Sequence, residues 1–184
     1  MNLMTFDGPI GPEKENAMMT CKPDEVEQPQ TAAAPQRPWA TSIAAMDRAI
    51  FAGNATAAVR AWREAYAAAL DDPGWAPMVD VAAACRRIGV IPGFAKTSEA
   101  RARETYWTAL FRARRQGSLN GVLQAAEAFG ALGDRSMVEQ CIHVAERLAA
   151  LTGDADAAQR VRTLAANLME RYVEAGRQSK NGGS

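Results

Sequence analysis

The side chains best suited to catalysis or metal binding lie around the single histidine of this sequence, His143. Glu139 precedes it by four residues and Glu146 follows it by three, a spacing that places all three side chains on one face of a helix. An imidazole between two carboxylates can bind a metal ion or transfer protons. The same spacing is also typical of a solvated helix face with local charge pairing, and we favour this second interpretation.

Other catalytic motifs are missing from the sequence. It contains no GxSxG elbow, no GxGxxG and no GxxxxGK[ST] phosphate loop. The aspartate pairs at 71–72 and 154/156 are explained by a turn and by a helix start. The three cysteines, which are odd in number, far apart and outside any CxxC motif, are Cys21, Cys85 and Cys141. We therefore predict no enzyme activity, no cofactor and no metal site, and keep a small helical enzyme centred on His143 as a third hypothesis.

Basic residues concentrate in the middle of a chain that is neutral as a whole, with 21 basic and 21 acidic residues. Residues 86–115 carry eight basic and two acidic residues, a net charge of +6. A cationic helix face can bind an acidic protein segment or the phosphates of a nucleic acid. A solvated arginine-rich face without a partner is the simpler alternative. The candidate partner-binding residues are Arg86, Arg87, Lys96, Arg101, Arg112 and Arg115, together with Trp107.

The elements that must position these residues are helices, since apolar residues recur at helical spacing from Trp39 onward. Four glycine–polar pairs separate the periodic segments: Gly53-Asn54, Gly117-Ser118, Gly133-Asp134 and Gly153-Asp154. Glycine suits the left-handed residue that ends a helix, and the Asn, Ser or Asp after it suits the next N-cap. Such tight turns predict antiparallel hairpins. The predicted helices span residues 42–52, 55–70, 77–88, 98–116, 119–132, 135–152 and 155–175.

The two ends of the chain have a different composition. Residues 1–38 hold six of the nine prolines and a net charge of −3, which predicts a disordered acidic leader that could cover the basic block until a partner displaces it. Residues 179–184 are expected to form a flexible polar tail. No signal peptide and no apolar stretch of membrane-spanning length is present, so we expect a cytoplasmic protein with no membrane partner. The alanine- and arginine-rich, lysine-poor composition suggests a bacterial source.

The hairpin from residue 119 to residue 152 resembles a tetratricopeptide repeat, a helix pair of about 34 residues with small and aromatic residues at fixed positions. The matching positions are Ala126 and Phe129 on the first helix, the turn Gly133-Asp134, and Ile142 and Ala145 on the second helix. Residues 42–70 fit the same frame less well, through the turn Gly53-Asn54 and through Ala58, Trp62 and Ala65. The third and fourth helices depart from it, because the loop from Gly89 to Thr97 is too long for the standard turn.

This resemblance implies a stack of hairpins that binds other proteins. We therefore expect an all-α domain over residues 39–178, with about seven helices stacked as a tetratricopeptide-like superhelix. Its expected function is that of a protein–protein interaction scaffold, adaptor or regulatory subunit. The alternative is a nucleic-acid-binding or transcription-associated domain that uses the basic block. In both cases we expect the concave side to be the working surface, with Arg101, Arg112 and Arg115 as the first residues to test.

Overall fold

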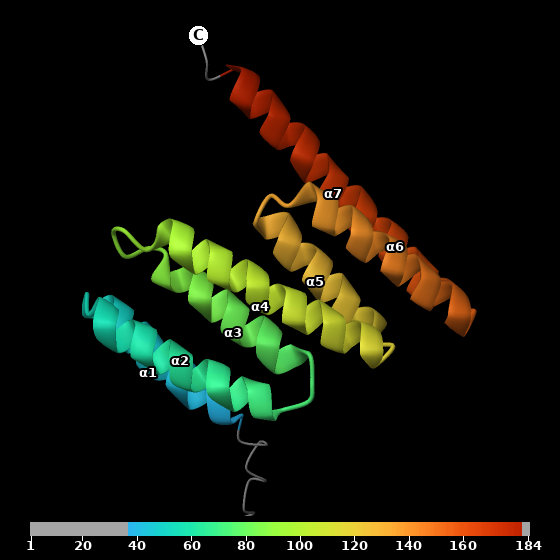
Figure 1. Ribbon diagram of the computed structural model, residues 1–184. Coiled ribbons are helices and arrows are strands. Elements are labelled where there is room, and N and C mark those ends of the chain that lie inside the picture. The colour runs from blue at the N-terminus through green and yellow to red at the C-terminus, as the bar shows by residue number, and fades with distance from the viewer. Residues whose placement is uncertain (1–36, 182–184) are drawn as a thin grey trace, which may run out of the picture. The chain divides into compact units, whose positions relative to one another are not determined.

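A computed structural model describes residues 37–181, which form seven α-helices and no strand (Figure 1). This confirms the all-α prediction for the described part of the chain. The predicted disordered leader falls almost entirely on residues 1–36, and the last three residues of the predicted tail are 182–184; both stretches lie outside the described residues. The helices are α1 (Pro38–Phe51), α2 (Ala55–Asp71), α3 (Ala76–Ile88), α4 (Ala95–Arg115), α5 (Leu119–Ala131), α6 (Arg135–Thr152) and α7 (Ala155–Asn181).

The turns between helices have the predicted chemistry. Positive φ angles of 62° to 71° occur at Gly53, Gly117, Gly133 and Gly153, where a β-carbon would be strained. The residue after each glycine accepts a hydrogen bond from a backbone N–H of the first helical turn, and these residues are Asn54, Ser118, Asp134 and Asp154. The sequence predicts these turns correctly because the glycine that ends one helix and the residue that caps the next depend only on their neighbours in the chain.

Three helix ends differ from the prediction by three residues or more. The first helix begins at Pro38, before the predicted Ser42, because the fixed φ of proline suits a first helical turn. Trp39 is then buried, and its Nε1 donates to an Asp80 carboxylate oxygen at 3.0 Å. The fourth helix begins at Ala95 rather than at Ser98, which shortens the predicted loop. The last helix continues to Asn181, beyond the predicted end at residue 175 and into the predicted tail.

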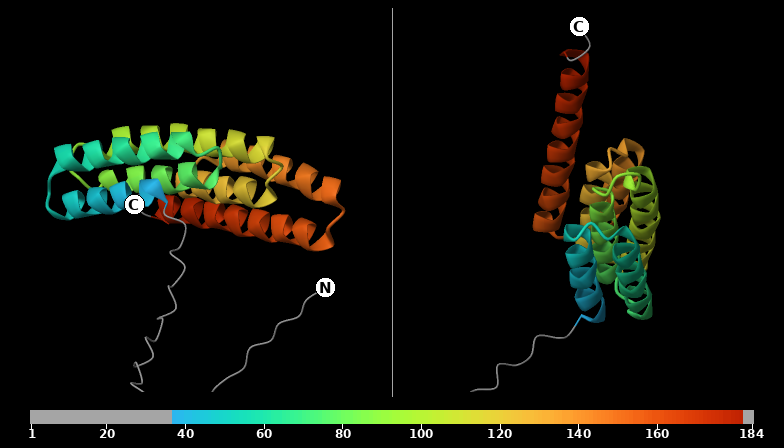
Figure 2. Two further views of the ribbon diagram at one scale, coloured as in Figure 1. Left: turned by 90° about the horizontal axis from the view of Figure 1, so that it is seen from below. Right: turned by 90° about the vertical axis from the view of Figure 1, so that its left-hand side faces the viewer.

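The helices pack as hairpins in two layers. Hairpin partners are α1 with α2, α3 with α4, and α5 with α6, and each remaining pair of consecutive helices is also in contact. The odd-numbered helices contact one another as well, α1 with α3, α3 with α5, and α5 with α7. The left view of Figure 2 shows α1, α3, α5 and α7 in one layer and α2, α4 and α6 in the other. Neighbouring helices of the odd-numbered layer therefore lie side by side.

Small residues let the layers approach closely. Alanines from α2 to α6 are fully buried, among them Ala58, Ala65, Ala102, Ala126 and Ala145. Phe129 is the largest fully buried side chain. Its ring lies 6.1 Å from that of Tyr106 and 5.8 Å from that of Trp107, both in edge-on arrangements. Within residues 37–181, no helix has the length and hydropathy needed to cross a membrane.

Candidate functional site

His143 lies on the exposed face of α6. Its side chain is 78% exposed, and Nδ1 is 3.4 Å from a carboxylate oxygen of Glu146. Glu139 pairs instead with Arg135, at 2.9 Å. Nowhere in the described part of the chain do three or more His, Cys, Asp or Glu side chains gather in a way that could hold a metal ion. The local pairing is that of a solvated helix face.

The two cysteines of the helical domain are buried. Burial raises the pKa of the Cys85 thiol to about 11, an effect that the charge of Arg101 partly opposes. Burial likewise raises the pKa of Cys141 to about 12, with a smaller contribution from Asp134. Both thiols are protonated at neutral pH, whereas a nucleophilic cysteine needs a thiolate. Neither residue is suited to covalent catalysis.

The structure uses Arg112 inside the fold rather than on a free outer face. Its guanidinium donates to the carbonyl oxygens of Ala69 and Leu70 at 3.1 Å each and of Gly74 at 3.0 Å, and also to that of Asp72. These carbonyls belong to the last turn of α2 and the loop after it, where a helix carries partial negative charge and unpaired acceptors. Arg112 therefore joins α4 to the end of α2, and we omit it from any binding surface.

Two more arginines of the predicted binding set also hold helices together. Arg87 on α3 forms two hydrogen bonds with Asp47 on α1, at 2.8 and 3.0 Å. Arg86 donates to the carbonyl oxygen of Ala131 at the end of α5, at 3.2 Å. Since these guanidinium groups bridge helices, much of the positive charge of the block is already matched by groups of the fold.

The remaining candidates do not form one patch. Lys96, Arg101 and Arg115 are exposed on α4, and Arg101 pairs with Glu104 at 3.0 Å. Arg101 and Arg115 are fourteen residues apart, which is roughly 21 Å along a helix. Trp107 is half-buried and stacks on Phe111, with ring centroids 5.7 Å apart. The structure thus places these residues along the whole length of α4, in the layer of even-numbered helices.

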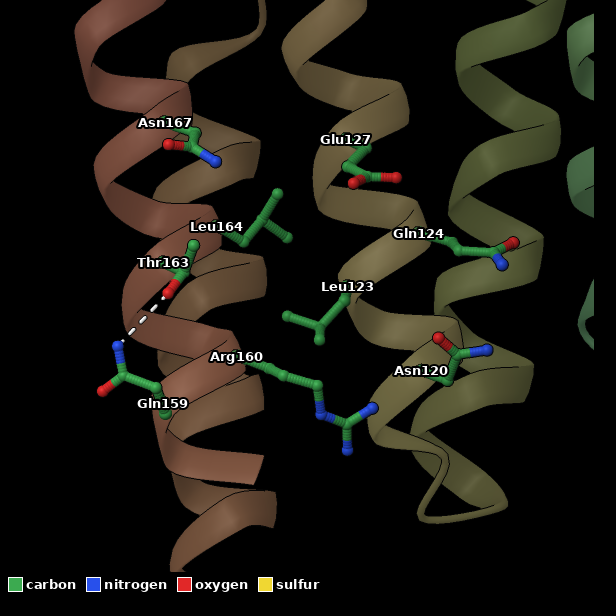
Figure 3. A pocket seen from close by; sticks show the side chains of 9 residues that line it. All are labelled: Asn120, Leu123, Gln124, Glu127, Gln159, Arg160, Thr163, Leu164 and Asn167. Atoms are coloured by element: carbon green, nitrogen blue, oxygen red, sulfur yellow. Dashed lines mark hydrogen bonds between the residues drawn. The ribbon is translucent and has the colours of Figure 1, made fainter. Parts of the chain in front are cut away.

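A groove of about 410 Å³ lies between α5 and α7, on the other layer (Figure 3). We call it the α5–α7 groove. Leu123 and Leu164 form its apolar floor, and Leu123 is only 8% exposed. Polar side chains form its walls, and the full polar set is Asn120, Gln124 and Glu127 from α5, with Gln159, Arg160, Thr163 and Asn167 from α7. Both rows follow the helical repeat, so each turn of either helix adds a polar group.

Several of these groups have unused hydrogen-bonding capacity. Gln159 donates to Thr163 at 3.3 Å and accepts from Arg162 at 2.9 Å. By contrast, the amides of Asn120, Gln124 and Asn167 form no hydrogen bond with any described side chain or backbone group. Each such amide can both donate and accept. The α5–α7 groove therefore presents paired donors and acceptors to whatever enters it.

The charges of the groove lie at opposite ends. Figure 3 shows Arg160 near Asn120 at one end and Glu127 level with Asn167 at the other. Neither Arg160 nor Glu127 takes part in an ion pair with any side chain of residues 37–174, the range whose side chains the structure describes. An occupant would meet a positive end, a neutral middle and a negative end. This arrangement gives the groove a direction.

The equivalent groove between α1 and α3 is different. Its volume is about 320 Å³, and its charged residues already pair across it, Arg87 with Asp47 and Arg37 with Asp80 at 3.9 Å. Trp39 also donates to Asp80 there. With its polar groups matched internally, this groove resembles a closed helix interface. The contrast singles out the α5–α7 groove as the candidate site.

The sequence did not reveal this groove. Asn120 and Gln124 on one helix, and Gln159 and Thr163 on another, each read as ordinary solvent-facing residues at a spacing of four. The missing information was that α7 packs beside α5, which joins two polar faces that are about forty residues apart. The available signal was the group of uncharged amides on the exposed faces of α5 and α7.

No family model matches this sequence. Comparison with curated proteins gives no significant match. The tetratricopeptide-like resemblance therefore rests on the residues quoted above alone and stays a prediction.

Proposed function

We propose that residues 38–181 form a protein–protein interaction scaffold whose working surface is the α5–α7 groove. The single observation that carries this proposal is the set of unpaired amides on two parallel rows above an apolar floor. A peptide backbone alternates N–H donors and C=O acceptors, and neutral amide side chains can pair with both. The groove has no acid–base pair or nucleophile, so binding is the chemistry that it supports.

The dimensions favour an extended segment of a partner protein. From Asn120 to Glu127 the α5 wall rises by seven residue steps, which is roughly 10 Å of helix. An extended peptide covers that length with about three residues. With Arg160 at one end and Glu127 at the other, the groove favours a segment that has an acidic residue about three positions from a basic one. One apolar side chain between them can contact the leucine floor.

The same proposal includes a tetratricopeptide-like stack. Support comes from the alternation of two helix layers, from the small buried residues Ala126 and Ala145, and from the glycine turn between α5 and α6. In such a stack each hairpin buries the face that its neighbour leaves open. An adaptor or regulatory subunit is then the expected biological role.

The test is a selection of short random peptides against the full chain. We expect enriched sequences with the acidic–apolar–basic pattern, and loss of their binding in an Arg160→Glu variant. A second selection against Arg160→Glu should enrich peptides that carry a basic residue in place of the acidic one. Such a change of preference reports on contact with Arg160, since a general loss of folding would enrich nothing.

The matched control is Arg115→Glu, which makes the same charge reversal on exposed α4. It should leave the selected peptides bound with unchanged affinity. If Arg115→Glu abolishes binding while Arg160→Glu does not, the working surface is the basic side of α4 and the groove proposal is wrong. Failure to enrich any peptide would also contradict it.

Nucleic-acid binding is the weaker alternative. The basic block that suggested it has Arg86, Arg87 and Arg112 engaged within the fold. The exposed remainder lies along one helix and includes Arg101, which is already paired with Glu104. A phosphate-binding face needs several free cations close together, because each contact neutralises one phosphate.

A further inference from the structure

A further hollow lies on the opposite layer, between α2 and α4 and beside the end of α3. Its volume is about 230 Å³. We call it the α2–α4 pocket. The side chains that make it apolar are Val59, Trp62, Cys85, Ile88 and Phe94. Trp62 is 7% exposed and Cys85 and Ile88 are each 3% exposed, so these three form the deep part of the pocket.

The polar groups of this deep part are already satisfied. Trp62 Nε1 donates to the carbonyl oxygen of Val81 at 3.0 Å. Ser98 donates through Oγ to the carbonyl oxygen of Ala95 at 3.0 Å, and the Cys85 thiol lies 3.5 Å from the carbonyl oxygen of Ser98. Water in the pocket would find few hydrogen-bond partners there, so an apolar group can displace it at little cost.

The rim, in contrast, is cationic. Arg63 on α2 and Arg101 on α4 both line the pocket, one from each flanking helix. Arg63 takes part in no ion pair with another described residue, and Arg101 has only its exposed contact with Glu104. No acidic side chain lines the pocket. An apolar interior beneath two guanidinium groups is complementary to a molecule with an apolar body and one anionic end.

We propose that the α2–α4 pocket binds a small amphipathic carboxylate, with its aromatic or branched aliphatic group against Trp62 and its carboxylate at Arg63 and Arg101. The proposal concerns a different site and a different class of ligand from the peptide groove. The two can therefore fail independently. Binding is noncovalent, because the Cys85 thiol is buried and protonated.

The experiment is a titration of the full chain with phenylacetate and 4-methylpentanoate, followed through the indole N–H resonance of Trp62. Phenylacetamide, which has the same ring without the charge, is the matched ligand control. For ligands of about ten heavy atoms we expect millimolar affinity, with the amide binding about tenfold more weakly. Added salt should weaken binding of the carboxylates and leave binding of the amide unchanged, because the charges at the rim are exposed.

Two variants test whether the rim charges bind the carboxylate. Both replace exposed side chains, so we expect the fold to be preserved. Arg63→Gln and Arg101→Gln should each lower the carboxylate affinity several-fold without affecting the amide, whereas Arg115→Gln should change neither. Three results would overturn the proposal: no shift of Trp62 at millimolar carboxylate, equal affinity for acid and amide, or insensitivity to both rim variants. Binding of a blocked Asp-Leu-Asp peptide without binding of either free carboxylate would also overturn it and assign the pocket to a partner side chain.

Discussion

At the scale of single residues, Gly121 shows how closely three helical segments approach. A β-carbon at this position would lie 2.7 Å from Cδ2 of the Trp75 ring and 2.7 Å from Cβ of Ala113. We expect Gly121→Ala to lower the free energy of unfolding by about 1–3 kcal/mol, since overpacking outweighs the gain in helix propensity. Urea denaturation measures the change.

The matched control is Gly130→Ala on the same helix. There the added β-carbon would meet the end of the Leu168 side chain at 2.8 Å, and a flexible methyl group can move aside. We expect Gly130→Ala to change the free energy of unfolding by an amount between a slight decrease and an increase of about 1 kcal/mol. Equal destabilisation by both variants would show that the tight contact at Trp75 has no special effect.

The buried thiols predict a pH dependence. Burial raises the pKa of Cys85 from 9.0 to about 11 and that of Cys141 from 9.0 to about 12 in the folded chain. The unfolded chain releases these protons first, so their stabilisation is fully present below about pH 9 and is lost as the pH rises through the folded values. We expect the free energy of unfolding to fall as the pH rises from about 9 to about 12, and to fall less steeply in a Cys85→Ala/Cys141→Ala variant. Parallel slopes for the two chains would contradict this account.

At the scale of helices, Arg112 shows how one side chain determines the position of another element. It reaches from α4 to four carbonyl oxygens around the end of α2. Arg112→Gln should lower the free energy of unfolding by about 1–3 kcal/mol, because partly buried acceptors lose a charged donor. Arg112→Lys should recover only part of the loss, because one ammonium cannot match a planar fork of donors. Arg115→Gln, an exposed change on the same helix, should stay within about 0.5 kcal/mol.

The helices themselves could largely be predicted from the sequence, because their ends depend on neighbouring residues. The glycine turn and N-cap at Gly133-Asp134 need only local backbone geometry. The burial of Trp39 could not be predicted in this way, because its hydrogen-bond partner, Asp80, lies 41 residues away. Arg112 was read as a surface cation for the same reason: its acceptors are carbonyls some forty residues earlier. Charge and periodicity indicate which face of a helix is polar, but not which element lies opposite it.

The candidate groove is a property of the packing between helices rather than of either helix alone. Asn120 and Gln159 become neighbours of one site only because α7 returns to the layer that contains α5. The residues first proposed for binding share one sequence segment, which covers the end of α3 and the length of α4. A functional surface on stacked hairpins therefore has to be sought across segments, at positions separated by about one hairpin.

At the scale of the whole domain, contacts connect only nearby helices. The first helix contacts α2 and α3, and the last contacts α5 and α6. Stability in such an array is close to a sum of local terms and neighbour interfaces, so the two ends can open separately. Leu168→Ala on α7 removes a side chain that is 2% exposed, and Met46→Ala on α1 removes one that is fully buried. Each substitution should lower the free energy of unfolding of the helices around it by about 2–5 kcal/mol.

Amide hydrogen exchange shows which helices lose stability in each variant. Leu168→Ala should accelerate exchange in α5, α6 and α7 while α1 and α2 keep their protection, because among the described residues α7 has no extensive contact with the first hairpin. Met46→Ala should give the reciprocal pattern, with faster exchange in α1 to α3 and unchanged exchange in α6 and α7. If either variant accelerates exchange equally in all seven helices, the domain unfolds as one cooperative unit and the α5–α7 groove is as stable as the rest of the fold. If the patterns are reciprocal, the groove lies in a part of the domain that opens independently of the first hairpin, and partner binding there should slow exchange mainly in α5 and α7.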